Sequence, residues 1–162
     1  MRTLIRVVLR SSYGVAGKYK PVKNKNDLDE TDVLNPKKRK YGFIEDERRD
    51  SETAPQAAIR ITKEYTGVKI FRHELTKLKT QNSRSGSTGI LTRTVTFGVS
   101  PPDSRIIEQV ITYRPDGTEC SIIPFDAPDL RLRLQQKFRS FLEANNLLKP
   151  PRKYRRSIGP VL

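Results

Sequence analysis

The segment 129–147 constrains the fold more than any other part of this chain, because its pattern predicts one amphipathic helix with both ends marked. Its apolar residues recur at helical spacing and form one stripe, made of Leu130, Leu134, Phe138, Phe141 and Leu142. Pro128 suits the first helical turn, and Pro150 with its neighbouring proline stops any continuation. Such a stripe needs a surface to cover, and the residues before it supply a β-sheet.

The residues between 41 and 123 predict β-structure. Strands are expected near 41–47, 57–64, 68–75, 89–99, 105–113 and 118–123. The tight turn 114–117 combines a proline that fixes φ with a glycine that takes a positive φ, and it should join two antiparallel strands. We therefore expect an α+β fold: a twisted antiparallel β-sheet of about six strands, covered by one C-terminal amphipathic helix, with irregular basic tails. The expected core is Ile59, Ile61, Val95, Phe97, Ile107, Ile111, Leu130, Leu134, Phe138 and Leu142.

The order of residues in the helix also resembles a known family. The pattern D-L-x-x-x-L-Q-x-x-F-x-x-F-L-E-x-x-N-L is similar to the last-but-one helix of the mitochondrial glycoprotein family, the acidic matrix proteins also known as complement-component-binding matrix proteins. Segments 41–48, 59–70 and 106–110 resemble its strands in the same order, so the resemblance covers about residues 36–148. It implies a link to mitochondrial translation and to assembly of respiratory complexes.

The chain departs from this family in two respects. Family members begin and end with helices that build a trimer, whereas no such helix is predicted before residue 36 or after residue 148. Family members are also acidic, whereas this chain has a formal net charge of +14. The missing helices argue against the family's homotrimer, and the binding of basic partners is not carried over.

Two short tails carry most of the positive charge. Residues 1–40 have a net charge of +7 and residues 149–162 of +5, whereas residues 41–148 have only +2. Basic tails on a nearly neutral domain favour contact with phosphate-rich partners, because each phosphate contact releases counterions. Tails that are merely solvated, or that bind an acidic protein, are the alternatives.

Three regions follow from this distribution: a basic N-terminal extension over 1–35, a mitochondrial glycoprotein-like domain over 36–148 and a basic C-terminal tail over 149–162. Residues 1–14 contain three arginines and no acidic residue, which is the composition of a mitochondrial import signal. An ordinary basic extension is the alternative. The single cysteine excludes an internal disulfide and suits a reducing compartment, and no apolar run is long enough to span a membrane. The predicted location is the mitochondrial matrix.

Residue types that carry catalysis are sparse. His73 is the only histidine and is expected on a strand, with no nucleophile or orienting group beside it. Cys120 is expected to be a buried, inert thiol. The acidic run 45–47 would be split between two faces of a strand, and no metal-ligand spacing is present. These patterns predict no enzyme activity, no cofactor, no metal and no small-molecule substrate.

Clusters of basic residues with an aromatic ring are the remaining candidate site, since arginine pairs with phosphate and tyrosine stacks on bases. The predicted RNA-binding residues are Lys37, Lys38, Arg39, Lys40, Arg152, Lys153, Tyr154, Arg155 and Arg156. We predict a structural component or assembly factor of the mitochondrial ribosome that contacts rRNA and ribosomal proteins. Two alternatives stay open: an adaptor, assembly factor or subunit of a respiratory-chain complex, and a free homotrimeric matrix chaperone.

Overall fold

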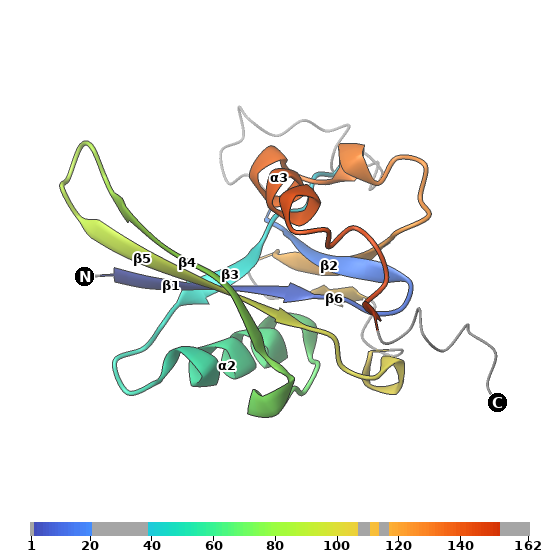
Figure 1. Cartoon of the computed structure of the whole chain (residues 1–162), viewed down its shortest axis with the longest axis horizontal. Helices are drawn as coiled ribbons and strands as arrows, with labels where there is room; N and C mark the ends of the chain where they lie inside the picture. The colour runs from blue at the N-terminus through green and yellow to red at the C-terminus, as the bar shows by residue number, and fades with distance from the viewer. Residues whose placement is uncertain (1, 21–38, 107–110, 114–116, 153–162) are drawn as a thin grey trace.

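The computed structural model describes residues 2–20, 39–106, 111–113 and 117–152, with only the backbone at 111–113. Two sheets form its centre, and α2 and α3 lie on opposite sides of them (Figure 1). Sheet A has the strand order β3-β1-β5-β4, and sheet B has the order β2-β7-β6. The strands are β1 (Arg2–Leu9), β2 (Gly14–Tyr19), β3 (Ile44–Glu47), β4 (Thr76–Arg84), β5 (Leu91–Val99), β6 (Ile111–Tyr113) and β7 (Glu119–Pro124).

The N-terminal strand β1 is a central element of sheet A. It pairs antiparallel with β3 and parallel with β5, and four of its apolar side chains, Ile5, Val7, Val8 and Leu9, are buried. The segment 1–35, predicted as an extension, therefore contributes two strands, β1 and β2, to the folded unit. Import into mitochondria through residues 1–14 stays a prediction.

A helix replaces the strand predicted at 57–64. α2 (Ala54–Thr66) begins at Thr53, whose hydroxyl accepts from the backbone N–H of Gln56 while the Gln56 side chain accepts from the backbone N–H of Thr53. It ends at Gly67, which adopts the left-handed conformation with φ 75°. Its apolar face packs against sheet A in a core cluster that includes Ala57, Ala58, Ile61, Ile5, Val95 and Phe97.

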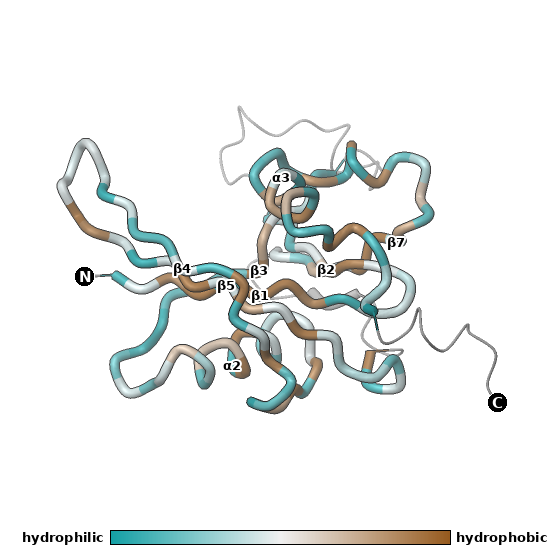
Figure 2. The backbone as a smooth tube through the Cα atoms, in the orientation of Figure 1, coloured by the Kyte–Doolittle hydropathy of each residue, from teal (hydrophilic) through white to brown (hydrophobic). Residues whose placement is uncertain are grey.

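The C-terminal helix is shorter than predicted. α3 (Gln136–Ala144) follows the 3₁₀ turn η5 (Arg131–Arg133), so the first part of the predicted helix is irregular. The expected stripe is nevertheless buried in a second core cluster, which includes Leu130, Leu134, Phe138, Leu142, Tyr41 and Phe43. Figure 2 shows the apolar stretches of β1 and β2 between α2 and α3. Two further 3₁₀ turns are η3 (Arg72–Glu74) and η4 (Asp103–Arg105).

The α+β class is confirmed, but the predicted architecture is wrong in its details. The described strands form two sheets, one strand pair is parallel, and two α-helices lie on opposite sides. Of the expected core, Ile61, Val95, Phe97, Leu130, Leu134, Phe138 and Leu142 are buried. Ile59 is half-buried, and the side chains of Ile107 and Ile111 lie outside the described part. No described helix has the length and apolarity that crossing a membrane requires.

Candidate functional site

A groove of about 660 Å³ lies between α3 and the face of sheet A that points away from α2. We call it the α3 groove. Strand register brings its sheet residues together, because Arg6 and Lys79 both lie beside Thr96 of β5, and Gln81 lies beside Thr94. The groove is lined by Arg6, Phe43, Lys79, Gln81, Gln136, Lys137, Ser140, Phe141, Ala144 and Asn145.

A fixed cation and two aromatic rings meet in this groove. The Nε of Arg6 donates to a carboxylate oxygen of Glu45 at 2.7 Å, and its guanidinium carbon lies 4.3 Å from the centroid of the Phe43 ring. That ring meets the Phe141 ring edge-on, with centroids 5.5 Å apart, and packs against Phe138 at 4.9 Å. The contact with the Phe43 ring and the hydrogen bond to Glu45 hold the Arg6 side chain in the lining of the groove.

The charge of the groove favours an anionic ligand. Three cationic side chains line it, those of Arg6, Lys79 and Lys137, and its lining includes no aspartate or glutamate. Glu45 offsets the charge of Arg6, whereas Lys79 and Lys137 are exposed. Cations beside an aromatic cluster match a ligand that joins phosphate groups to a flat ring system.

A second cluster, between β3 and α2, consists of acidic residues around one arginine. Arg60 of α2 donates to both carboxylate oxygens of Glu52, at 2.7 and 3.0 Å, and to the carboxylate of Glu64 at 3.2 Å. It also donates to the main-chain oxygen of Glu47 at 2.9 Å and lies 3.9 Å from the carboxylate of Asp46. We call this the Arg60 cluster. Hydrogen bonding from Arg60 lowers the pKa of Glu52 below its usual 4.5.

Three of the nine predicted RNA-binding residues lie in the described part of the chain. Lys40 and Arg152 are exposed, and neither they nor Arg39 line the α3 groove. Arg39 forms an ion pair with the buried Glu119 and lies over the Tyr19 ring, with its guanidinium carbon 5.1 Å from the centroid. The other six, Lys37, Lys38, Lys153, Tyr154, Arg155 and Arg156, lie outside the described residues. RNA binding by these residues stays a prediction.

Glu119 also contacts Tyr41, since its carboxylate accepts a hydrogen bond from the Tyr41 hydroxyl at 3.1 Å. Burial, and then the charge of Glu119, raise the pKa of Tyr41 from 10.0 to about 12. The folded pKa is raised, so the stabilisation is complete below pH 10 and is lost as the pH rises towards 12. We expect the free energy of unfolding to fall over this range in urea titrations. A Tyr41→Phe variant should lack this part of the fall, and an identical fall in both proteins would contradict the assignment.

The structure also places the histidine, the cysteine and the acidic run that the sequence analysis considered for catalysis. His73 lies on the 3₁₀ turn η3 rather than on a strand, and its ring stacks on Phe71 with centroids 5.9 Å apart. Cys120 is buried, as predicted. The acidic run at 45–47 is divided as expected, since Glu45 pairs with Arg6 and Asp46 lies near Arg60.

Comparison with known proteins identifies a fold that the sequence analysis missed. No protein-family model and no curated protein sequence matches the chain. Among solved structures, it is similar to a MutT protein from Bacillus halodurans, with 10% identity and a TM-score of 0.61 over 88% of this chain and 80% of that one. It is also similar to a mutT/nudix family protein from Listeria innocua, with 13% identity and a TM-score of 0.57 over 90% and 91% of the two chains.

A MutT/nudix family protein from Enterococcus faecalis gives 14% identity and a TM-score of 0.52. The match covers 76% of this chain and 43% of that protein, so the chain spans less than half of its length. At these identities the likeness shows the fold alone.

The predicted membership in the mitochondrial glycoprotein family is wrong, because the structural neighbours are MutT/nudix proteins. The resemblance treated residues 59–70 as two strands and a hairpin, whereas α2 occupies most of that segment. The same neighbours contradict the predicted roles as a ribosomal component with rRNA and ribosomal-protein partners, as a respiratory-complex adaptor and as a homotrimeric chaperone.

The neighbours also contradict the prediction that the protein is not an enzyme and has no small-molecule substrate. They are named as MutT or MutT/nudix family proteins, and what their fold suggests about activity is taken up under the proposed function. Sequence analysis missed the α3 groove because its residues come from β1, β4, α3 and the chain just before β3, which are far apart in the chain. Of these residues, Phe141 was assigned to the apolar stripe of the predicted helix and Arg6 to the predicted import signal.

Enzymes that cleave phosphoanhydride bonds commonly neutralise the phosphates with Mg²⁺ held by one or two carboxylates. In the described part of the chain, no group of three or more His, Cys, Asp or Glu side chains is placed to hold a metal. The carboxylates of Asp46, Glu52 and Glu64 instead face the guanidinium of Arg60. The guanidinium of Arg60 already supplies the positive charge among these carboxylates, so they do not fit a divalent ion.

Proposed function

We propose that this protein is a hydrolase that binds a nucleoside diphosphate derivative in the α3 groove. The observation that carries the proposal is the meeting of cations and aromatic rings in one groove of about 660 Å³. A nucleoside diphosphate has the two matching parts, since its base offers a π-face and its diphosphate offers several negative oxygens.

Phe141 is the ring that we expect to contact the base. It is half-buried, and the buried Phe43 fixes its orientation through an edge-on contact with centroids 5.5 Å apart. Stacking on an aromatic side chain contributes about 1–3 kcal/mol per base and accepts any base. The amides of Gln81, Gln136 and Asn145 lie in the same lining and can bond to the edge of a base.

Arg6, Lys79 and Lys137 are the groups that we expect to contact phosphate. Among the described residues, the Arg6 side chain makes one hydrogen bond, from its Nε to the carboxylate of Glu45. The terminal nitrogens of its guanidinium are thus left for phosphate oxygens, which they can bind in the two-pronged manner typical of arginine. Lys79 on β4 and Lys137 on α3 add charge from the two sides of the groove.

The hydrolytic part of the proposal is supported by the likeness of the fold to MutT/nudix hydrolases. In the reaction, a water oxygen forms a bond to one phosphorus atom while the bond from that phosphorus to the bridging oxygen breaks. The bridging oxygen leaves with the other phosphoryl group, and a proton of the water is released.

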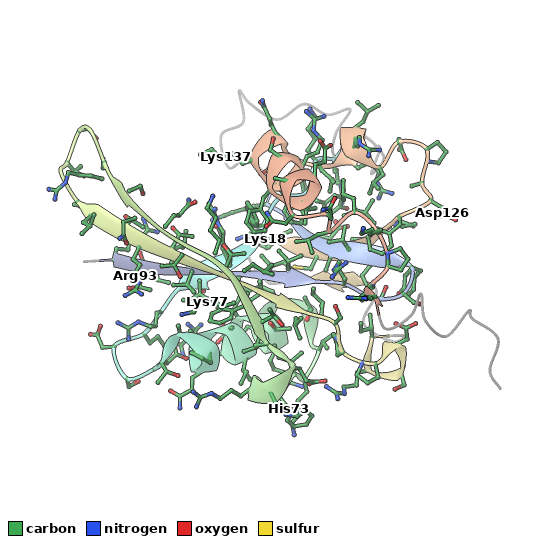
Figure 3. The ribbon with its side chains drawn as sticks, in the orientation of Figure 1. Lys18, His73, Lys77, Arg93, Asp126 and Lys137 are labelled. Atoms are coloured by element: carbon green, nitrogen blue, oxygen red, sulfur yellow. The ribbon has the colours of Figure 1, made fainter. Side chains whose placement is uncertain are left out.

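Binding is tested by titrating ADP, GDP and inorganic pyrophosphate into the purified protein in a calorimeter. We expect Phe141→Ala to weaken ADP and GDP binding by about tenfold, because one base-stacking contact is lost, and to leave pyrophosphate binding unchanged. Lys137→Gln should weaken all three. Lys77→Gln is the matched control, because Lys77 lies beside Phe97 on the opposite face of sheet A (Figure 3). Equal affinities in all variants would reject the α3 groove as the site.

Turnover is followed separately by ³¹P nuclear magnetic resonance, with ADP-ribose and the nucleoside diphosphates as test substrates. New monophosphate signals that require the active protein are the expected result. Binding without any new signal would reject hydrolysis of these compounds and leave the groove assignment in place.

A further inference from the structure

The hairpin formed by β4 and β5 projects beyond the rest of the fold. Figure 1 shows it at the upper left, where it extends past both α2 and α3. We call its outer part, residues 79–93, the hairpin arm. No residue of the arm is buried, and residues 79–90 are all exposed. The arm contributes only Lys79 and Gln81 to the α3 groove, so most of its surface serves no purpose described above.

The charge of the hairpin arm has one sign. The arm includes Lys79, Arg84 and Arg93 and no aspartate or glutamate. Within the described part of the chain, none of these three side chains forms an ion pair. The positive charge is therefore not balanced inside the protein, and it attracts an anionic partner.

Strand geometry distributes this charge over both faces of the arm. Lys79 and Gln81 line the α3 groove, so they point toward α3. Because successive side chains on a strand alternate between faces, Asn82 and Arg84 point to the opposite face, as does Arg93, which lies beside Asn82 on β5. Cations on both faces of a ribbon match a partner that presents negative charge on two sides of it.

The uncharged side chains of the arm suit a nucleic acid better than a protein surface. Ile90 and Leu91 are its only large apolar residues, whereas the centre of a protein–protein interface is apolar. Amide and hydroxyl groups hydrogen-bond to phosphates and to the edges of bases. The strands of the arm carry such groups at Gln81, Asn82, Ser83 and Thr92.

The arm is ordered by its own hydrogen bonds before any partner binds. Its loop is closed by bonds from Ser85 N–H to the Ile90 carbonyl at 3.0 Å and from Gly89 N–H to the Ser85 carbonyl at 2.8 Å. The Arg84 side chain also donates to the Gly89 carbonyl, at 3.2 Å. A preformed arm loses little conformational entropy on binding.

Protection of an exposed sheet edge does not account for the pattern of charges. β4 is an edge strand of sheet A, and charged side chains on such a strand discourage pairing with another chain. Arg93, however, is on β5, which pairs with β4 on one side and with β1 on the other. Its charge does not guard the edge.

We propose that the hairpin arm docks in the major groove of duplex DNA. That groove is about 12 Å wide and admits a two-stranded β-ribbon, whose strands are about 4.8 Å apart. Phosphates then flank the arm on both sides, with Arg84 and Arg93 toward one backbone and Lys79 toward the other. Duplex RNA does not fit, because its major groove is deep and narrow. This inference is independent of the proposed function.

The test is fluorescence anisotropy of the full chain with a labelled DNA duplex of about two helical turns, over a series of NaCl concentrations. Basic segments elsewhere in the chain also attract DNA, so two variants of equal charge are compared. Arg84→Gln combined with Arg93→Gln should weaken binding about tenfold and reduce the salt slope by about 2, because two phosphate contacts are lost. Lys63→Gln combined with Arg72→Gln removes the same charge from exposed positions outside the arm and should change both quantities much less.

Equal losses in the two double variants would overturn the assignment, because net charge alone would then explain DNA binding. It would also be overturned if the wild type bound no DNA, bound duplex RNA of the same sequence equally well, or preferred polyglutamate, which would assign the arm to an acidic protein. Unchanged melting temperatures would show that the variants are folded. ADP binding should be the same in all of them, since none of the four substituted residues lines the α3 groove.

Discussion

Replacing Phe138 with alanine is expected to lower the free energy of unfolding by about 4 kcal/mol. Phe138 is fully buried, at 0% exposure, in the cluster that attaches α3 to the sheets. Its ring lies 4.9 Å from that of Phe43, centroid to centroid. Truncation removes the apolar transfer energy and leaves a cavity that the surrounding strands and helix fill only in part. For a chain of this length the melting temperature should fall by about 8–16 °C.

Urea denaturation measures this change, and Phe141→Ala is the matched control. Phe141 is on the same helix and in the same cluster but is only half-buried, so its truncation should cost about 1–2 kcal/mol. Phe138→Ala should also weaken ADP binding, because the α3 groove loses its support. A loss below about 1 kcal/mol in Phe138→Ala would show that α3 is not held by this contact.

The stripe that contains Phe138 was the part of the fold most accessible from sequence. Helical spacing identified the buried side of α3, and four of its five residues are buried. The start of the helix was missed for a tertiary reason. The backbone of Tyr41 bonds to the chain on both sides of Leu134, accepting from Gln135 N–H and donating to the Arg133 carbonyl, each at 2.8 Å. These long-range bonds hold the Leu134 backbone in an extended conformation, so the helix begins only at Gln136.

α2 was missed although its end signals are present in the sequence. Ile59 and Ile61 alternate with polar residues, and β-branched residues in alternation favour a strand. The capping box of Thr53 and Gln56 and the left-handed Gly67 instead define a helix with apolar residues on one side. In this segment the capping signals, rather than the β-propensity of the isoleucines, agree with the observed structure.

The site was hidden because it depends on strand pairing. Arg6 was assigned to an import signal, whereas its strand pairs in parallel with β5, more than eighty positions further along the chain. A parallel strand partner so far along the chain leaves no local pattern in the amino-acid sequence. Once β1 lies beside β5, Arg6 and Lys79 share one face, and the groove follows from the docking of α3.

Replacing Arg60 with methionine is expected to lower the free energy of unfolding by about 3 kcal/mol. The side chain is only 14% exposed, and it holds the loop before α2 through Glu52 and the main-chain oxygen of Glu47. Methionine keeps much of the volume but leaves the carboxylates of Asp46, Glu52 and Glu64 without their shared cation. Their mutual repulsion and their incomplete hydration then oppose the folded loop.

Three comparisons separate this effect from a general packing defect. Arg60→Lys restores the charge without the forked geometry and should recover only part of the stability. Arg49→Met is the exposed control: Arg49 is 65% exposed, lies 3.5 Å from the Glu64 carboxylate, and should cost less than about 1 kcal/mol. The third comparison is acid denaturation. The folded pKa of Glu52 is lowered, so its stabilisation is present above pH 4.5 and is lost as the pH falls below it. In Arg60→Met the unfolding free energy should depend less on pH in this acidic range. A variant as stable as wild type, with the same acid profile, would show that the loop is held by its backbone contacts rather than by Arg60.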